Sequence, residues 1–340
     1  ESFPPNFCSA NFLTCFMLAL LPAASEFDDE AECAANHFAQ VIRYENKGES
    51  LSEQPLCVRN DNTLIPVIHR GFIMSEEQFA MFEANLAKHG LAVITSREHH
   101  TLLAYFPLQH HLIATETSRF RSVELPVTTL ADGLTHADVR ERCLPVCEQI
   151  VAEGDWRFVV LKDFVKSEKS TLEHFDRFLR APTEDASDLA ERCADLALLR
   201  AEKDRLYRGI VLKEGVPLAQ YPSTRCAVSG YQGALPFVLN EWRLWIIRED
   251  SDYRIMTASP NSFQIPEMVD PVPEEMQQFA LQVARRIGHP YITFDVAETE
   301  DTIEEDQIRW IVLEIGDGAS AGPASGQDMD EHWKQLRLIS

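Results

Sequence analysis

The chain has 340 residues, 45% of them hydrophobic and 25% charged, which is enough for two or three globular units with cores of their own. Its 31 basic and 54 acidic residues give a formal charge of −23. This balance disfavours general nucleic-acid binding, because a phosphate backbone would be repelled over most of the surface. Eight scattered cysteines without paired short spacing exclude a zinc-finger or disulfide-framework protein and predict reduced thiols in a cytoplasmic protein.

An apolar stretch at residues 12–24 ends in Leu-Pro-Ala-Ala-Ser, like the end of a secretion signal. It lacks a basic region before it, so we interpret it as a buried first strand, with a signal peptide as the less favoured alternative. Elsewhere no run approaches the about 20 apolar residues of a membrane span, so no membrane association is expected.

The first part of the chain alternates between strand and helix patterns. Strands are predicted at residues 16–21, 39–44, 64–69 and 91–95. Between the first two strands, an acidic stretch at 26–32 leads into a helix that ends near residue 38, and a second helix is predicted at 76–88. This order is typical of two βαβ units with a parallel sheet, a small Rossmann-like domain. It lacks the GxGxxG fingerprint of dinucleotide binding, and a helical segment at residues 98–120 leads out of it.

From about residue 123 the pattern changes to short strands of antiparallel character, rich in β-branched and aromatic residues. They are predicted at residues 157–164, 209–213, 242–248, 291–296 and 309–315, with helices at 137–152, 188–206 and 274–287 and a loop at 316–330. The sequence therefore predicts an α/β domain over residues 1–122, an α+β domain over 123–330 and a tail over 331–340.

Two strand ends carry the strongest chemical signal. Asp295 closes the apolar run Tyr-Ile-Thr-Phe, and Glu314 closes Trp-Ile-Val-Leu and is followed by Ile-Gly-Asp317-Gly. Carboxylates at the ends of neighbouring strands are hard oxygen ligands suited to one or two Mg²⁺ ions beside a triphosphate. Ordinary strand-terminal acids in an acidic protein are the alternative, and the joint spacing favours the metal site.

Two lysine-bearing strands give a second signal. Lys162 lies in the run Phe-Val-Val-Leu-Lys-Asp-Phe, and Lys166 follows four residues later. A lysine on a buried strand is costly unless it faces an anion, so phosphate contacts are expected, with a solvated edge strand as the alternative. A further strand ends in Lys213 and Glu214 before a turn with Gly and Pro. The backbone N–H and C=O groups exposed at this junction could pair with the edge of an adenine, and Glu214 could reach a ribose hydroxyl.

A third pattern places Glu241 and Arg243 on one face of a strand, because residues two apart share a face. An arginine there suits neutralisation of a transferring phosphoryl group, and a cross-strand salt bridge is the alternative. The histidine pairs 99–100 and 110–111 have no partner cluster at ligand spacing, so no metal role is predicted for them.

Taken in order, these elements resemble the ATP-grasp superfamily, and in detail its R-two-K clade of predicted carboxylate-amine ligases. The match extends upstream to His-Arg70-Gly-Phe, which resembles the clade's pre-ATP-grasp region. The motif positions here are Lys162, Asp163, Lys166, Lys169, Lys213, Glu214, Glu241, Arg243, Asp295, Glu314, Gly316, Asp317 and Gly318. Two departures are Lys213, where an arginine is expected, and the sequence Ala-Ser-Ala-Gly-Pro after Gly318, where the clade usually has Gln-Val-Ser-Gly-Leu-Pro.

The resemblance implies a Rossmann-like pre-ATP-grasp domain followed by a two-lobed ATP-grasp fold that binds ATP and Mg²⁺. It also implies a ligase that activates a small-molecule or peptide carboxylate as an acyl phosphate for attack by an amine. A kinase-like phosphotransferase and a decayed ATP-binding protein are the alternatives. The implied roles are phosphate contacts for Lys162 and Lys166, adenosine contacts for Lys213 and Glu214, and a further nucleotide-binding position at Glu241. They also include phosphoryl stabilisation for Arg243, metal binding for Asp295, Glu314 and Asp317, and a grip on the carboxylate substrate for Arg70.

Overall fold

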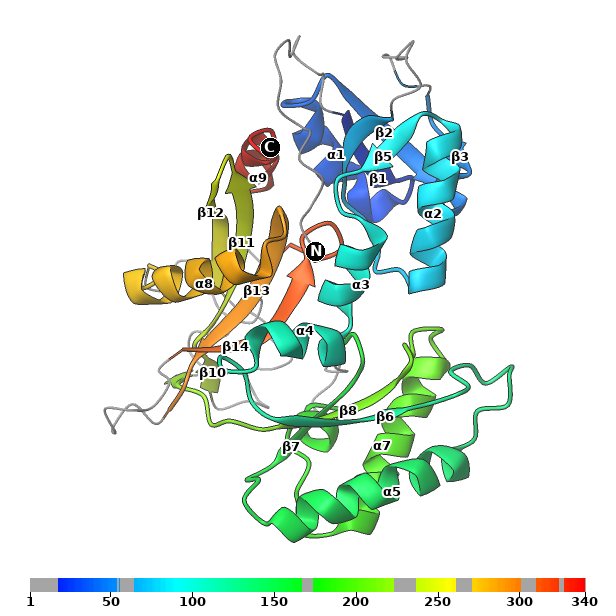
Figure 1. The fold of residues 1–340 in the computed structure, drawn as a ribbon, viewed down its shortest axis with the longest axis vertical. Helices are drawn as coiled ribbons and strands as arrows, with labels where there is room; N and C mark the ends of the chain where they lie inside the picture. Colours follow the sequence, from blue (N-terminus) through cyan, green and yellow to red (C-terminus); the bar gives the residue numbers. More distant parts are fainter. Residues whose placement is uncertain are drawn as a thin grey trace.

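A computed structural model describes residues 18–53, 55, 64–166, 174–222, 237–260, 271–300, 310–323 and 327–339. Three larger sheets follow one another along its long axis, each with helices against it (Figure 1). Predictions made for the first residues of the opening strand, for Lys169, and for Cys8, Cys15, Cys57 and Cys226 lie outside these residues. Within the described part, the helices are too short or too polar to cross a membrane.

The N-terminal sheet has five strands in the order β3-β2-β1-β4-β5, parallel except for β3. Helix α1 connects β1 to β2, and α2 connects β4 to β5, as the two predicted βαβ units require. Helix α2 begins with a capping box at Ser75 and is followed by Gly90 at φ +76°, which suits a helix end. The elements are β1 (Leu18–Pro22), η1 (Ser25–Phe27), α1 (Asp28–Ala35), β2 (Gln40–Glu45), η2 (Asn46–Gly48), β3 (Ser50–Leu51), β4 (Ile65–His69), α2 (Glu76–Lys88) and β5 (Leu91–Val93).

The segment predicted as helical after this sheet forms α3 (Arg97–Ala104) and α4 (Phe106–Ile113), but the helix ends there and β6 (Phe120–Glu124) follows. Strand β6 pairs with β8 (Gly209–Glu214), which pairs with β7 (Val159–Asp163), all antiparallel. One face of this sheet packs on α5 (His136–Glu153) and α7 (Ala186–Ala201). In the chain, a short helical turn, η3 (Phe175–Leu179), comes between β7 and α7. The predicted boundary between residues 122 and 123 falls inside β6.

The four-stranded sheet has the order β12-β11-β13-β14 and is antiparallel throughout. Its strands are β11 (Glu241–Glu249), β12 (Asp252–Pro260), β13 (Tyr291–Glu298) and β14 (Trp310–Asp317), and α8 (Glu274–Ile287) packs on one face. A separate two-stranded sheet is formed by β9 (Gln220–Pro222) and β10 (Phe237–Leu239). Part of the segment predicted as a tail belongs to α9 (Met329–Leu336), whose buried Trp333 contacts Phe38 of the N-terminal unit.

Candidate active site

Three predicted site residues form a row across the four-stranded sheet. Arg243 of β11 pairs in register with Asp295 of β13, which pairs with Glu314 of β14. Because paired residues share a face, the three side chains lie on one side, while Leu244 and Phe294 point into the core beneath α8. The predicted alternation along β11 is therefore confirmed.

Alternation along β7 and β8 places Lys162 and Lys213 on the face opposite the helices, since Leu161 and Leu212 belong to the core with α5 and α7. Lys162 Nζ lies 3.1 Å from one carboxylate oxygen of Glu314. Lys166 Nζ lies 2.9 Å from the other. A lysine of β7 and a lysine of the turn after β7 thus meet one carboxylate of the four-stranded sheet.

A short turn holds Lys166 in place. The buried carboxylate of Asp163 accepts hydrogen bonds from the backbone N–H groups of Val165 and Lys166, each at 2.6 Å, and an ion pair from Arg200 at 2.8 Å. Burial raises the pKa of Asp163, although these contacts act in the opposite direction. The turn after β7 therefore has an internal anchor that the sequence motif did not identify as such.

Lys213 is 5% exposed and donates to the carbonyl oxygen of Leu313 at 2.8 Å. The Nζ atoms of Lys213 and Lys162 both lie 4.9 Å from the ring centroid of Phe106, at the start of α4. Burial, reinforced by repulsion from Lys162, lowers the pKa of Lys213 to about 7, against the attraction of Glu314. No sequence motif pointed to Phe106, which lies far from either lysine in the chain.

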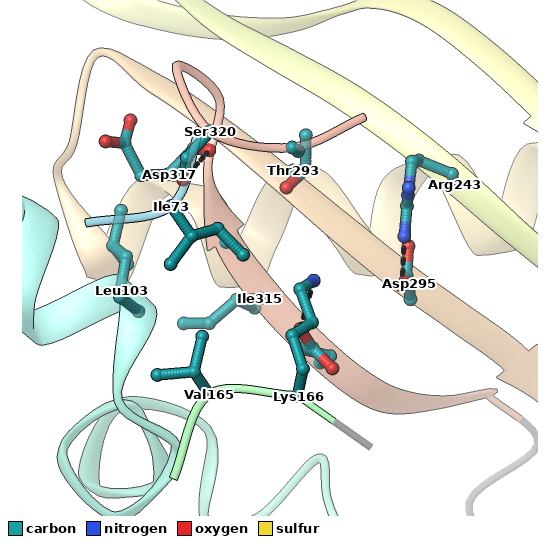
Figure 2. Close-up of a pocket in the computed structure, with 14 residues that line it drawn as sticks. Ile73, Leu103, Val165, Lys166, Arg243, Thr293, Asp295, Ile315, Asp317 and Ser320 are labelled. Carbon is teal, nitrogen blue, oxygen red and sulfur yellow. Dashed lines mark hydrogen bonds and ion pairs between the residues drawn. The ribbon is translucent and has the colours of Figure 1, made fainter. Parts of the chain in front are cut away.

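Arg243 makes a two-point ion pair with Asp295, both nitrogen–oxygen distances being 2.7 Å, and its third nitrogen donates to the carbonyl of Gly322 at 3.0 Å. Figure 2 shows this pair at one side of a pocket, with Lys166 facing it from the turn after β7. The pocket is lined by Ile73, Leu103, Ala104, Val165, Lys166, Arg243, Thr293, Asp295, Glu314, Ile315, Gly316, Asp317, Ser320 and Ala321.

The two carboxylates that line the pocket beside these cations suit Mg²⁺. Burial acts to raise the pKa of Glu314, but attraction from Lys162 and Lys166 outweighs it, so the group is ionised throughout the physiological range. No group of three or more His, Cys, Asp or Glu side chains in the described residues is arranged to hold a metal. Mg²⁺ commonly uses one or two carboxylates together with phosphate oxygens and water, so the pair Asp295 and Glu314 fits it.

Asp317, the third predicted metal ligand, is 1% exposed and has partners on both carboxylate oxygens. One oxygen accepts from Thr95 at 3.2 Å and from the N–H of Ala319 at 3.0 Å, and the other lies 3.0 Å from Nδ1 of His100. These contacts tie the end of β14 to the N-terminal unit. The metal role of Asp317 stays a prediction, and His100, for which no metal role was expected, is its ion-pair partner.

Two further predicted residues lie beside other groups. Glu214 makes a two-point ion pair with Arg119 at 2.9 and 2.7 Å, so its predicted approach to a ribose hydroxyl would require exchange of this partner. Glu241 lies two residues before Arg243 on the same strand and contributes to the negative field around that guanidinium, behind the larger effect of Asp295. The nucleotide roles of both stay predictions.

Comparison with known proteins bears on the same region. The family model for an ATP-grasp domain, R-two-K clade family 3, matches residues 153–336. A comparison with curated protein sequences finds no match.

Solved structures with a similar fold cover nearly the whole chain. D-cycloserine synthetase DcsG has 14% identity and a TM-score of 0.54, over 95% of this chain and 99% of that one. D-alanyl-alanine synthetase A from Vibrio cholerae O1 biovar eltor has 12% identity and a TM-score of 0.51, over 96% and 99%. The N5-carboxyaminoimidazole ribonucleotide synthetase purK, solved with ADP, has 12% identity and a TM-score of 0.53, over 96% and 77%. At these identities the likeness concerns the fold.

Proposed function

Since the chain belongs to family 3 of the R-two-K clade of ATP-grasp domains, we propose that it is an ATP-dependent carboxylate-amine ligase. The observation that carries this proposal is the row of Arg243, Asp295 and Glu314, whose last member is met by Lys162 of β7 and Lys166 of the turn after it. It combines cations for a triphosphate with carboxylates for Mg²⁺ at one pocket. The names of the solved neighbours, three synthetases, agree with a bond-forming reaction.

In the proposed reaction a carboxylate oxygen of the substrate attacks the γ-phosphorus of ATP, and the bond to ADP breaks. An amine then attacks the acyl carbon, phosphate leaves with the electron pair of its bond, and the amine loses a proton. Lys162 and Lys166 bind phosphate oxygens, and Arg243 stabilises the transferring phosphoryl group. Mg²⁺, held by Asp295 and Glu314 with Asp317 as a further predicted ligand, would neutralise phosphate charge.

The protein's own ion pairs imply a partner exchange when nucleotide binds. Lys162 and Lys166 are paired with Glu314, and Arg243 with Asp295. Phosphate oxygens would take over the cations while the metal takes over the carboxylates. Nucleotide and metal are therefore expected to bind together more favourably than either alone, which is a coupling free energy between two ligands.

We further propose a pre-ATP-grasp domain, predicted over residues 1–122, and a catalytic domain, predicted over 123–330, with the division placed before β6 because all of β6 pairs with β8. The substrates we propose are a small-molecule or peptide carboxylate and an amine. Cys143 and Cys147 of α5 and Cys193 of α7 are buried in the core, and their reduced state stays a prediction. The cytoplasmic location stays a prediction.

A trapping experiment tests the proposed chemistry. The purified protein is incubated with ATP, Mg²⁺, pooled carboxylic acids including the amino acids, and hydroxylamine as a surrogate amine, and hydroxamate and ADP are measured by mass spectrometry. Hydroxamate that disappears in Glu314→Gln supports acyl-phosphate chemistry and identifies the acid. ADP with a stable phosphoester would instead indicate a kinase, and Mg²⁺-dependent ATP binding without ADP would indicate a binding protein.

A further inference from the structure

Arg70 lies directly after β4, and its side chain is almost fully enclosed, with 1% exposed. Its Nε lies 2.6 Å from one carboxylate oxygen of Glu30 on α1, and Nη2 lies 3.4 Å from the other. Glu30 is itself buried. The guanidinium also lies over the ring of Trp245, at 4.8 Å from its centroid. A charge in such surroundings is stable only while its partners stay in place.

The remaining donors of Arg70 reach the turn that follows β14. Nη1 donates to the carbonyl oxygens of Gly318 and Ala321, each at 2.7 Å. The neighbouring N–H of Gly71 donates to the carbonyl of Ala319 at 2.8 Å. Three carbonyls of this turn, about 250 residues away in sequence, are thus bound by two consecutive residues of the N-terminal sheet.

The same turn forms part of the pocket wall. Ser320 and Ala321 line the pocket, and Gly322 accepts a hydrogen bond from Arg243. Gly318 packs so closely on Tyr291 that an added Cβ would lie 2.5 Å from its ring. The turn, residues 318–322, therefore accepts hydrogen bonds from both Arg70 and Arg243. Figure 2 shows Ser320 of this turn at the pocket.

We propose that Arg70 is a positioning residue: paired with Glu30, it fixes the backbone of residues 318–322, and through it the acceptor side of the pocket and Arg243. This inference rests on the proposed function, because that function makes the pocket a ligase site. It replaces a direct grip on the substrate carboxylate, since the guanidinium is buried and its nitrogens already contact Glu30 and the turn. The guanidinium meets both carboxylate oxygens of Glu30 and two carbonyls at once, which makes four contacts, whereas an ammonium has only three donors.

The first test measures hydrogen exchange of the backbone amides at residues 316–323 by mass spectrometry, with and without Mg²⁺ and the ATP analogue AMP-PNP. Arg70→Lys and the double variant Glu30→Met with Arg70→Met are compared with wild type. The double variant removes both buried charges, so it avoids the instability of a single unpaired one. We expect exchange in the turn to rise by about tenfold in both variants, the loss expected for hydrogen bonds to a charged donor.

Arg43→Met is the matched control. Arg43 also pairs with an acid, Asp28, and donates to two carbonyls, those of Pro22 and Ala24, but these lie in the N-terminal unit. Its loss should leave exchange at residues 316–323 as in wild type. Unchanged exchange in the double variant, or full protection in Arg70→Lys, would overturn the positioning role of Arg70.

The second test separates positioning from substrate contact. In the hydroxylamine assay we expect the double variant to raise the apparent KM for hydroxylamine by about tenfold, because a displaced pocket wall weakens acceptor placement. The Kd for Mg²⁺ and AMP-PNP should stay within about twofold of wild type, since Lys162 and Lys166 do not contact the turn. Two single variants identify the opposite result, in which Arg70 binds the substrate directly. In that case Glu30→Gln would change neither the amide exchange at residues 316–323 nor any KM, and Arg70→Met would raise only the KM for the carboxylate. Because exchange needs no turnover, an inactive wild-type protein would count against the ligase function and not against the positioning role.

Discussion

The two ion-pair systems of the site differ in what they join. Arg243 and Asp295 belong to neighbouring strands of one sheet, so the strand register fixes their geometry. Lys162 and Lys166 meet Glu314 across the space between two separate sheets. The contact between Arg243 and Asp295 depends only on strand pairing, whereas the contacts of Lys162 and Lys166 with Glu314 depend on how the two sheets are placed. Nucleotide binding can therefore change the relative placement of the two sheets through the contacts with Glu314.

The difference also concerns charge balance. Glu314 faces two ammonium groups with Lys213 close by, whereas Asp295 faces one guanidinium in a planar two-point contact. Removing Glu314 therefore leaves an excess of partly buried positive charge, and removing Arg243 leaves a partly buried negative one. The two changes should affect nucleotide binding with opposite signs.

Glu314→Gln should have the largest effect. We expect turnover in the hydroxylamine assay to fall by about 1,000-fold, since a metal-held charge at the phosphates contributes several kcal/mol. Binding of ATP in the presence of EDTA should become tighter, because Lys162 and Lys166 lose their internal competitor. Calorimetric titration measures the Kd for ATP under these conditions. Glu148→Gln, which changes an exposed glutamate on α5, is the control. Weaker metal-free binding in Glu314→Gln would show that the lysines do not contact the triphosphate.

Asp163→Asn tests the anchor on the lysine side. The amide keeps one acceptor for the turn but removes the negative charge that pairs with the buried guanidinium of Arg200. We expect the free energy of unfolding to fall by about 3 kcal/mol, as for other broken buried pairs, measured by chemical denaturation. The double variant Asp163→Leu with Arg200→Leu should recover most of it. If the free energy of unfolding fell as much in the double variant as in Asp163→Asn, the hydrogen bonds to the turn would be the cause of the loss.

Local patterns predicted much of this site because its backbone is regular. Alternation along β11 separated Arg243 from Trp242 correctly, and the apolar runs before Asp295 and Glu314 belong to two paired strands. The two acids were predicted at strand ends, but β13 continues to Glu298 and β14 to Asp317. Strand β12 was missed. Its residues Asp252–Pro260 mix polar and apolar types, and it forms because β11 turns back at Asp250, at φ +54°, and offers it an edge.

Partner identity could not be predicted in the same way. His100 and Asp317 are 217 residues apart, and Arg119 and Glu214 are 95 apart, so no spacing rule connects them. The motif singled out Arg70 as a contact of the substrate carboxylate, whereas its contacts with Glu30 and the turn after β14 depend on how the N-terminal sheet meets the catalytic one. A motif indicates that a residue matters, and only the tertiary arrangement shows what it touches.

Arg243→Lys tests the pair within one sheet. An ammonium keeps the positive charge but loses the two-point contact with Asp295 and the donor to Gly322. We expect kcat to fall by about 100-fold, the effect of losing one transition-state donor, with the Kd for ADP and Mg²⁺ nearly unchanged. Arg248→Lys, further along β11, serves as control. A change confined to the Kd would place Arg243 among nucleotide-binding groups and not at the transferring phosphoryl group.

The smallest effect concerns pH. With the pKa of Lys213 at about 7 in the free protein, its ammonium loses its proton as pH rises above that value, while bound phosphates favour the charged form. Nucleotide binding should then take up a proton, so the Kd for ADP should rise by about tenfold between about pH 7 and pH 9. Lys213→Met should remove this slope while leaving binding above about pH 9 similar to wild type. Titration calorimetry in buffers of different ionisation enthalpy measures the proton uptake directly. An equal slope in wild type and Lys213→Met would mean that Lys213 keeps its proton in the free protein or stays away from the phosphates.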